Sequence, residues 1–366
     1  IDALVQHPFH LLILDEAQSV KNAASRSAAA VRRLQARHRL CLTGTPLENH
    51  LGELWAQFDF LMPGYLGDAR SFQRQWRDPI EHNGETLRAQ VLHQRVRPFI
   101  LRRRKADVAV ELPPKTEVVQ RVSLEGRQKA LYESVRVAAD EQVRRVLRRE
   151  GFAGAQITIL DALLKLRQVC CDPALLKGRP LPRTMERAKL AWLADTLPEL
   201  VAEGRRVLLF SQFTEMLHLI ADALQPGAGA WAMLTGETPP AQRREVVQRF
   251  QSREVPVMLI SLKAGGVGLN LTAADTVIHV DPWWNPAVVE QATDRAHRLG
   301  QDQPVLVYKL VVAGSIEERI LALQARKSAL AEGILGQDAA QALKFTPADL
   351  DALLAPLGDN VMQPPT

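Results

Sequence analysis

The sequence predicts an α/β protein with two halves, each built on a parallel β-sheet, and with helical insertions added to them. Three observations support this prediction. Short apolar runs alternate with helical segments near the start of the chain, the same alternation returns in its second half, and the stretches between them have helical periodicity. We expect the following divisions: 1–115 with a helical protrusion at about 51–112, a linker and helical insertion at 116–185, the second half at 186–335, and a tail at 336–366.

The first half begins with two short apolar runs that we predict to be buried strands. LLIL at 11–14 is the first, and RLCLTGTP at 39–46 contains the second and ends in a turn. Between them, the alanine-rich segment 25–35 is predicted to be a helix with Ser25 as its N-cap. This strand–helix–strand order favours a parallel sheet.

Helical patterns dominate the middle of the chain. Residues 51–112 show them with breaks at a Pro-Gly and an Asn-Gly pair, and a second helical stretch runs from about 126 to 177 with a glycine-rich break at 151–154. The segment ELPPKTE at 111–117 separates the two stretches. Because its adjacent prolines exclude helix and favour extended chain, we predict a linker there.

The second half repeats the alternation of strands and helices. Strands are predicted at 206–213, 231–236, 256–261, 276–280 and 304–312, and helices at 214–224, 240–251 and 315–330.

The chain carries a modest excess of positive charge, which favours polyanionic partners without identifying one. The formal net charge is +5, and basic residues gather at 102–105 and at 144–149. The second group has helical spacing, so it is either a solvated helix face or a contact to a phosphate backbone.

Other features exclude several classes of protein. No apolar run approaches the ~18–20 residues of a membrane span, and the first residues lack the basic start and apolar centre of a signal peptide. Three cysteines, two of them adjacent at Cys170 and Cys171, are too few for a disulfide framework and lack metal-ligand spacing. We expect reduced thiols, no membrane partner, and a cytoplasmic protein of the bacterial cytoplasm or nucleoid.

Two polar turns follow the apolar runs of the first half. Asp15 and Glu16 come directly after LLIL, where one carboxylate can hold Mg²⁺ and the other can orient water for phosphoryl transfer. Thr43, Gly44 and Thr45 follow the next strand and suit a loop that senses phosphate or links two sites. Each turn taken alone is also compatible with an ordinary surface turn.

The stretch WWNPAVVEQATDRAHRLGQ at 283–301 is the most informative. Asn285-Pro286 is a helix-start signal. At ~100° per residue, one face of this helix would carry Gln291, Arg295 and Arg298. An apolar docking stripe, by which the helix would pack against the protein, would consist of Ala292, Ala296 and Leu299. Two converging guanidinium groups favour an anion such as phosphate between them, although pairing with Glu290 and Asp294 on a solvated face is the alternative.

A glycine-rich segment, SLKAGGVGLNL at 261–271, follows one of the predicted strands. Gly265, Gly266 and Gly268 would let the backbone approach a ligand closely, and Asn270 could contact a sugar or phosphate. The segment lies at the carboxyl end of a strand, where open α/β sheets bind ligands.

These motifs, in this order, resemble the SWI/SNF-type family of duplex-DNA-translocating ATPases in helicase superfamily two. LDEAQ resembles motif II, LTGTPLEN motif III, LLFSQF motif IV, SLKAGGVGLNL motif V and QATDRAHRLGQ motif VI, and DPWWNP between the last two is typical of the family. The resemblance extends to about residue 330. It implies two RecA-like lobes, the first of them truncated, with ATP between them.

The resemblance also implies roles for individual residues. Asp15 and Glu16 would serve Mg²⁺ and water, Arg295 and Arg298 would be arginine fingers, and Gln18 would couple the site to neighbouring motifs. Near the nucleotide we expect Gly266, Gly268 and Gln291. We assign to DNA contact Thr43, Ser211, Gln212, Lys263, Arg103 and Arg104, with Lys263 standing where the family commonly has arginine.

The phosphate-binding loop GxxxxGK[ST] is not found, because the 366 residues contain no Gly-Lys dipeptide. We expect that the chain is the C-terminal part of a longer protein, the alternative being natural loss of the loop. The implied function is ATP-dependent translocation on double-stranded DNA, with a DNA-bound complex such as RNA polymerase as a further partner. The alternatives are a strand-separating helicase or, for the fragment alone, a non-hydrolysing DNA- or protein-binding module.

Overall fold

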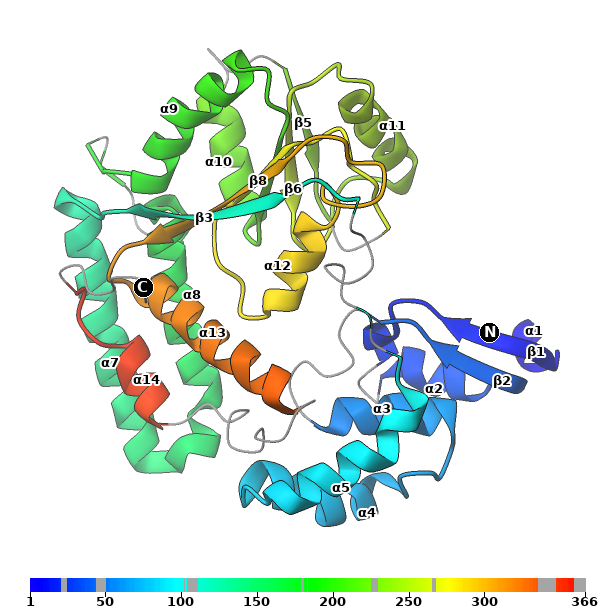
Figure 1. The fold of residues 1–366 in the computed structure, drawn as a ribbon. Coiled ribbons are helices and arrows are strands. Elements are labelled where there is room, and N and C mark those ends of the chain that lie inside the picture. The colour runs from blue at the N-terminus through cyan, green and yellow to red at the C-terminus, as the bar shows by residue number, and fades with distance from the viewer. Residues whose placement is uncertain are drawn as a thin grey trace. The chain divides into compact units, whose positions relative to one another are not determined.

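The computed structural model describes the chain in these ranges: 1–20, 25–43, 51–101, 103, 111–178, 181–182, 184–224, 230–264, 268–334 and 347–358. The chain divides into two compact units. The first comprises residues 1–103 and 325–345, and the second comprises residues 104–324 and 346–366. The prediction of an α/β protein with parallel sheets is confirmed, since each unit contains parallel strands accompanied by helices (Figure 1).

The sheet of the first unit has two parallel strands, β1 (Phe9–Leu14) and β2 (Ala36–Cys41). Helix α2 (Arg26–Arg32) connects them and begins as predicted, because the Ser25 side chain accepts a hydrogen bond from the backbone N–H of Ala28 at 3.1 Å. Both strands therefore end at the same edge of the sheet, where the polar turns follow.

The prediction that these two strands are buried is wrong. Leu11 and Ile13 of β1 are each 48% exposed, and Leu40 of β2 is 43% exposed. Successive strand residues point to opposite faces, and the alternating burial shows that only one face of this sheet is covered by the described residues. The apolar run alone does not distinguish a strand covered on both faces from one covered on a single face.

Residues 51–99 are mostly helical, as the sequence pattern there predicted. Besides α2, the helices described between residues 1 and 103 are α1 (Asp2–Val5), η1 (Ala17–Val20), α3 (Leu51–Leu61), α4 (Ala69–Phe72), the π-helix η2 (Gln73–His82), α5 (Thr86–Val96) and η3 (Arg97–Phe99). The predicted breaks coincide with Gly64 and Gly84, whose φ angles of +83° and +70° suit glycine. Phe58, Ile80 and Leu92 bring three of the helices onto one apolar core.

The second unit is built on a six-stranded sheet in which every neighbouring pair is parallel. In spatial order the strands are β3 (Lys115–Val122), β8 (Val305–Val312), β7 (Thr276–His279), β4 (Val207–Ser211), β6 (Val257–Ser261) and β5 (Trp231–Leu234). The five strands predicted for the second half are confirmed. The central ones are buried throughout, because helices cover both faces of the sheet.

Strand β3 was not predicted. Residues 115–117 of the linker expected at 111–117 belong to β3 instead, and all eight residues of the strand pair with β8. The two prolines hold the chain extended up to the strand, which explains why the linker pattern and the strand adjoin. KTEVVQRV has the mixed polarity of a strand at the sheet edge, a weaker signal than a buried apolar run.

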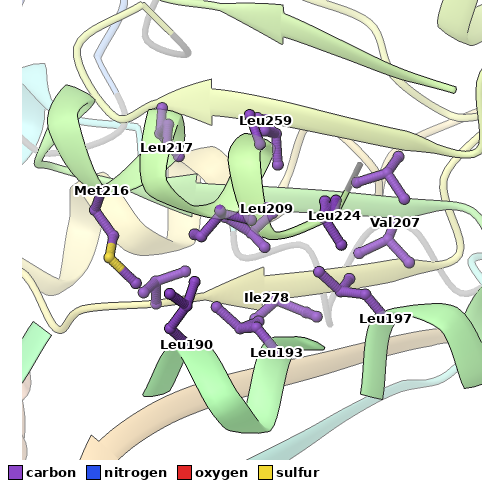
Figure 2. Packing of buried hydrophobic residues seen from close by; sticks show 14 of the residues in the cluster. Leu190, Leu193, Leu197, Val207, Leu209, Met216, Leu217, Leu224, Leu259 and Ile278 are labelled. Carbon is purple, nitrogen blue, oxygen red and sulfur yellow. The ribbon is translucent and has the colours of Figure 1, made fainter. Parts of the chain in front are cut away.

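Two helix layers enclose this sheet. Figure 2 shows Leu193 of α9 (Ala188–Ala202) and Leu217 of α10 (Thr214–Leu224) packed with Leu209 of β4. The next residue along β4, Phe210, belongs to the core on the opposite face, which includes side chains from α11 (Pro240–Gln251) and α12 (Pro286–Thr293). The result is a three-layer arrangement of helices, sheet and helices.

The second helical stretch forms a pair of helices, α7 (Gly126–Gly154) and α8 (Gln156–Cys171), that pack against each other (Figure 1). Gly151, with φ of +69°, interrupts α7 within the predicted break. The remaining helices are η4 (Pro173–Leu175), α13 (Ile316–Ile334) and α14 (Pro347–Leu353). None of the helices in the described ranges is both long and apolar enough to span a membrane.

The tail contains α14, which the sequence did not predict. The segment 347–358 is tied to the rest of the second unit through backbone atoms. The N–H of Leu357 donates to Glu133 of α7 at 2.7 Å, and the N–H of Gly358 donates to the carbonyl of Gly314 at 3.2 Å. Leu353 and Leu354 are buried, so the segment is part of the packed unit.

Candidate functional site

The acidic turn lies where β1 ends. An Asp15 carboxylate oxygen accepts the backbone N–H of Glu16 at 2.9 Å, and Glu16 has φ of +50°. A non-glycine residue in this left-handed region costs roughly 1–2 kcal/mol, and such strain concentrates at functional sites. The N–H of Ala17 donates to the carbonyl of Leu42 at 3.0 Å. The turn is thereby joined to the loop after β2, which begins with the partly exposed Thr43.

This turn has the chemistry that Mg²⁺ requires. Asp15 is exposed and Glu16 is partly exposed, so carboxylate oxygens are available for a hard, hydrated cation. The described residues contain no cluster of three or more metal-ligating side chains. Mg²⁺ commonly takes one or two carboxylates and completes its shell with water and phosphate, so two carboxylates fit the ion. The backbone of Gln18 lies in η1, whereas its side chain, Gly44 and Thr45 lie outside the described structure.

Helix α12 begins as predicted and ends early. Asn285 caps it by accepting the N–H of Ala287 at 3.0 Å, and Pro286 is its first residue. The helix stops at Thr293, so the prediction that Arg295 lies on the same helical face as Gln291 is wrong. Gln291 is partly exposed on the helix, and the arginine lies in the turns that follow.

The predicted docking stripe is confirmed only in part. Ala292 and Ala296 are buried in the sheet core, whereas Leu299 is 65% exposed because the chain has left the helix by then.

The two arginines nevertheless converge, on a backbone carbonyl. Arg295 and Arg298 each point an Nη1 atom at the carbonyl oxygen of Leu269, at 3.5 and 3.3 Å. The N–H of Leu271 returns a hydrogen bond to the carbonyl of Arg295 at 3.0 Å. Arg295 is 7% exposed and Arg298 is partly exposed. The glycine-rich segment and the arginine pair thus form one structure. Glu290, one of the two acidic residues in the alternative, pairs instead with Lys115 at 2.6 Å.

Gln301 fixes this structure and was missed by sequence reasoning. Its amide nitrogen donates to the carbonyls of Thr272, Ala274 and Ala296 at 3.2, 2.7 and 3.0 Å. Its amide oxygen accepts the N–H groups of the next two residues. One buried side chain therefore joins the end of the glycine-rich segment to the end of the arginine segment. No local pattern signals this, because its partners are backbone atoms up to 29 residues away.

The strand ends of the second unit carry the predicted DNA-contact residues. Ser211 is fully buried and donates its hydroxyl to the buried Asp281 at 2.6 Å, so it exposes no atom to a DNA strand here. The N–H of Gln212 approaches both oxygens of Asp281 at 3.3 Å. Burial raises the pKa of Asp281, while these donors and Arg167 favour its charged form. Lys263, in the turn after β6, is exposed.

The remaining predicted residues are placed as follows. Gly268 has φ of +46° and open space where a side chain would lie, which suits a close approach by a ligand. Arg103 is exposed. Gly266 and Arg104 lie outside the described residues.

The fold and the site together define a class of protein: a core of the helicase type, with RecA-like lobes, an acidic turn on one sheet and an arginine pair on the other. Comparison agrees with this class, since residues 2–175 match the SNF2-related domain and residues 188–300 match the helicase conserved C-terminal domain. The SWI2/SNF2 ATPase core of Sulfolobus solfataricus, solved in complex with double-stranded DNA, is 32% identical. The match covers 96% of this chain and 74% of that one, with a TM-score of 0.53. The chain belongs to the SWI2/SNF2 family.

Curated proteins similar to this chain support the same family assignment. The putative ATP-dependent helicase/translocase YwqA of Bacillus subtilis is 39% identical over 89% of this chain and 36% of its own length. The human SWI/SNF-related matrix-associated actin-dependent regulator of chromatin subfamily A member 1 is 37% identical over 85% of this chain and 30% of its own length. The chain spans about a third of the length of the curated relatives it matches.

Proposed function

We propose that this chain belongs to a motor that couples ATP hydrolysis to movement along double-stranded DNA. The observation that carries the proposal is the convergence of Arg295 and Arg298 on the Leu269 carbonyl. Both contacts are long for hydrogen bonds and use a neutral acceptor. A phosphate oxygen would be the stronger acceptor, since charge-assisted bonds are roughly twice as strong as neutral ones. The carbonyl thus brings the two guanidinium groups together, as two arginine fingers on one triphosphate require.

In this proposal each unit contributes groups of its own to ATP hydrolysis. Asp15 and Glu16 would hold Mg²⁺, which would neutralise charge on the phosphates, and Glu16 would orient the attacking water. Arg295 and Arg298 stabilise the charge that develops on the transferred phosphoryl group. Gln18, Gly266, Gly268 and Gln291 are proposed to lie near the nucleotide.

Contacts to DNA are proposed to be contacts to its phosphates. Lys263 and Arg103 are exposed and can meet phosphate directly, and Gln212, at a strand end, is a further proposed contact. Ser211 acts indirectly in this proposal, because its bond to Asp281 fixes the loop that carries Gln212. We keep Thr43 and Arg104 as proposed contacts. Binding should then be largely independent of base sequence and should weaken steeply with salt.

The test is made in the full-length protein, by measuring ATP turnover with and without duplex DNA. Arg298→Ala should lower DNA-stimulated turnover by roughly 10³-fold or more, as for arginine fingers elsewhere, and retain DNA affinity. Arg295→Ala should likewise lower turnover and retain DNA affinity. Because Arg295 is buried, the folding of this variant must be checked. Arg244→Ala, an exposed arginine on α11, is the matched control and should have no effect. Normal turnover in both finger variants would exclude the assignment.

A second experiment concerns the chain alone. No part of the 366 residues can form GxxxxGK[ST], so we expect no measurable ATP hydrolysis by residues 1–366 alone. Hydrolysis stimulated by duplex DNA would contradict this expectation. In the full-length protein, displacement of one strand from a duplex would favour a strand-separating helicase. Displacement of a bound protein, RNA polymerase being one candidate, without strand separation would favour the translocase.

A further inference from the structure

Arg167 of α8 is buried in a position that the proposed function does not use. It is 3% exposed, and its Nη2 donates to the carbonyl of Pro282 at 2.6 Å. The centre of its guanidinium group lies 5.7 Å from the ring of Trp283 and 5.6 Å from the ring of Trp284. The planar cation therefore holds three consecutive residues of the segment 281–285, which connects β7 to α12.

The segment 281–285 is anchored at both of its ends to the candidate site. At its start, Asp281 accepts the Ser211 hydroxyl and the N–H of Gln212. At its end, Asn285 caps α12, and that helix leads directly into Arg295 and Arg298. A displacement of the segment would therefore change both the strand end that carries Gln212 and the start of the helix before the arginine pair.

On its other side Arg167 belongs to the α7–α8 pair, which carries exposed positive charge. Arg145 and Arg148 of α7 are exposed and lie three residues apart on the helix surface. Their neighbours Arg144 and Arg149 are engaged with Asp140 and Glu150. The α7–α8 pair can thus meet a phosphate backbone, which was one of the two interpretations of this basic run.

A buried arginine is a costly way to attach a helix to a loop. Burial lowers the pKa of Arg167, and its Nε has no hydrogen-bond partner among the described residues. Its attraction to the buried Asp281 offsets part of this cost. The planar guanidinium group contacts two indole rings and one carbonyl. It therefore fixes the angle between α8 and the segment 281–285 as well as the distance between them.

The geometry points to Arg167 as the positioning residue that couples the α7–α8 pair to the arginine pair, so that DNA bound on α7 accelerates ATP turnover through the segment 281–285. This inference rests on the proposed function. It assigns to α7–α8 a part in DNA-dependent activation in addition to DNA affinity.

The experiment compares variants of the full-length protein by the stimulation factor, which is turnover with saturating duplex DNA divided by turnover without it. Arg167→Met should lower this factor at least tenfold, with KM for ATP and Kd for DNA within twofold of wild type. Arg167→Lys, which retains the charge, should recover part of the factor. Arg136→Met is the matched control: Arg136 of α7 is largely buried and donates to the Leu354 carbonyl at 3.1 Å, away from the segment. It should leave the factor unchanged.

A double-mutant cycle separates coupling from general damage. The pair Arg145→Gln and Arg148→Gln should lower the stimulation factor in an otherwise wild-type protein. In the Arg167→Met background it should lower the factor little further, because the path is already interrupted. Independent, multiplicative effects would overturn the inference.

The outcomes are distinguishable. A wild-type protein without DNA-stimulated ATPase activity refutes the proposed function, whereas full stimulation in folded Arg167→Met refutes only the coupling. If Arg167→Met does not fold, the stimulation factors of Arg167→Lys and Trp284→Leu test the inference, because each substitution weakens the contact between the guanidinium group and the indole ring. Both must then show a lowered factor, and wild-type factors in both would overturn the inference.

Discussion

Acid should destabilise the second unit through one buried imidazole. His279 of β7 is 2% exposed and stacks on Phe210 with 5.5 Å between ring centres. The Thr293 hydroxyl donates to the Val289 carbonyl at 3.1 Å, so its oxygen is left to accept from His279 Nε2, 2.9 Å away. The ring is thereby held as the neutral tautomer protonated on Nε2. Burial lowers the pKa of His279 to about 3, because the charged ring would lose its hydration.

The sign and size of the effect follow from proton linkage. A histidine in the unfolded chain has a pKa of about 6.5. Between that pH and about 3 the unfolded state binds a proton that the folded state does not, so stability falls as pH falls through this window. Integration from pH 7 to pH 5 gives a loss of about 2 kcal/mol. That is a large part of the ~5–15 kcal/mol by which a domain is usually stable.

Urea unfolding of wild type and His279→Gln at pH 7 and pH 5, followed by tryptophan fluorescence, measures this loss. The glutamine amide can donate to Thr293 but takes up no proton in this range. The variant should be less stable at pH 7, yet lose about 2 kcal/mol less than wild type on acidification. His218→Asn, at an exposed position of α10, is the control and should behave as wild type. Equal losses in wild type and His279→Gln would refute the reasoning.

Three further predictions concern the second unit. Lys189 and Glu317 are both fully buried and 2.7 Å apart, so Lys189→Met or Glu317→Gln should cost about 3–5 kcal/mol in urea unfolding, and the double variant should cost less than the sum. Gly314→Ala should release the segment 347–358 to limited proteolysis, because a methyl group would lie 2.2 Å from the Gly358 carbonyl oxygen. The adjacent thiols of residues 170 and 171 should resist alkylation until the protein unfolds, because they are buried and burial raises the pKa of both; rapid labelling of the native protein would contradict this.

Local patterns predicted the second unit well, because its central strands are apolar runs between amphipathic helices. They also predicted that Arg295 and Arg298 converge, but for the wrong reason: helical periodicity was assumed, and the actual organiser is the Leu269 carbonyl. A backbone acceptor has no sequence signature. Arg167 was missed for a related reason, since its partner Pro282 lies 115 residues away. Residues whose role is to hold distant backbone atoms are the ones that sequence reasoning leaves out.

The pairing of β3 with β8 has a practical consequence for work on the second lobe alone. Motif boundaries suggest that a fragment beginning near residue 188 would be complete. Such a fragment would lack Lys115–Val122 and would leave the long β8 as an open edge strand, with unsatisfied N–H and carbonyl groups. We expect it to self-associate, whereas a fragment beginning ahead of Pro113 would keep that edge covered and stay monodisperse in size-exclusion chromatography.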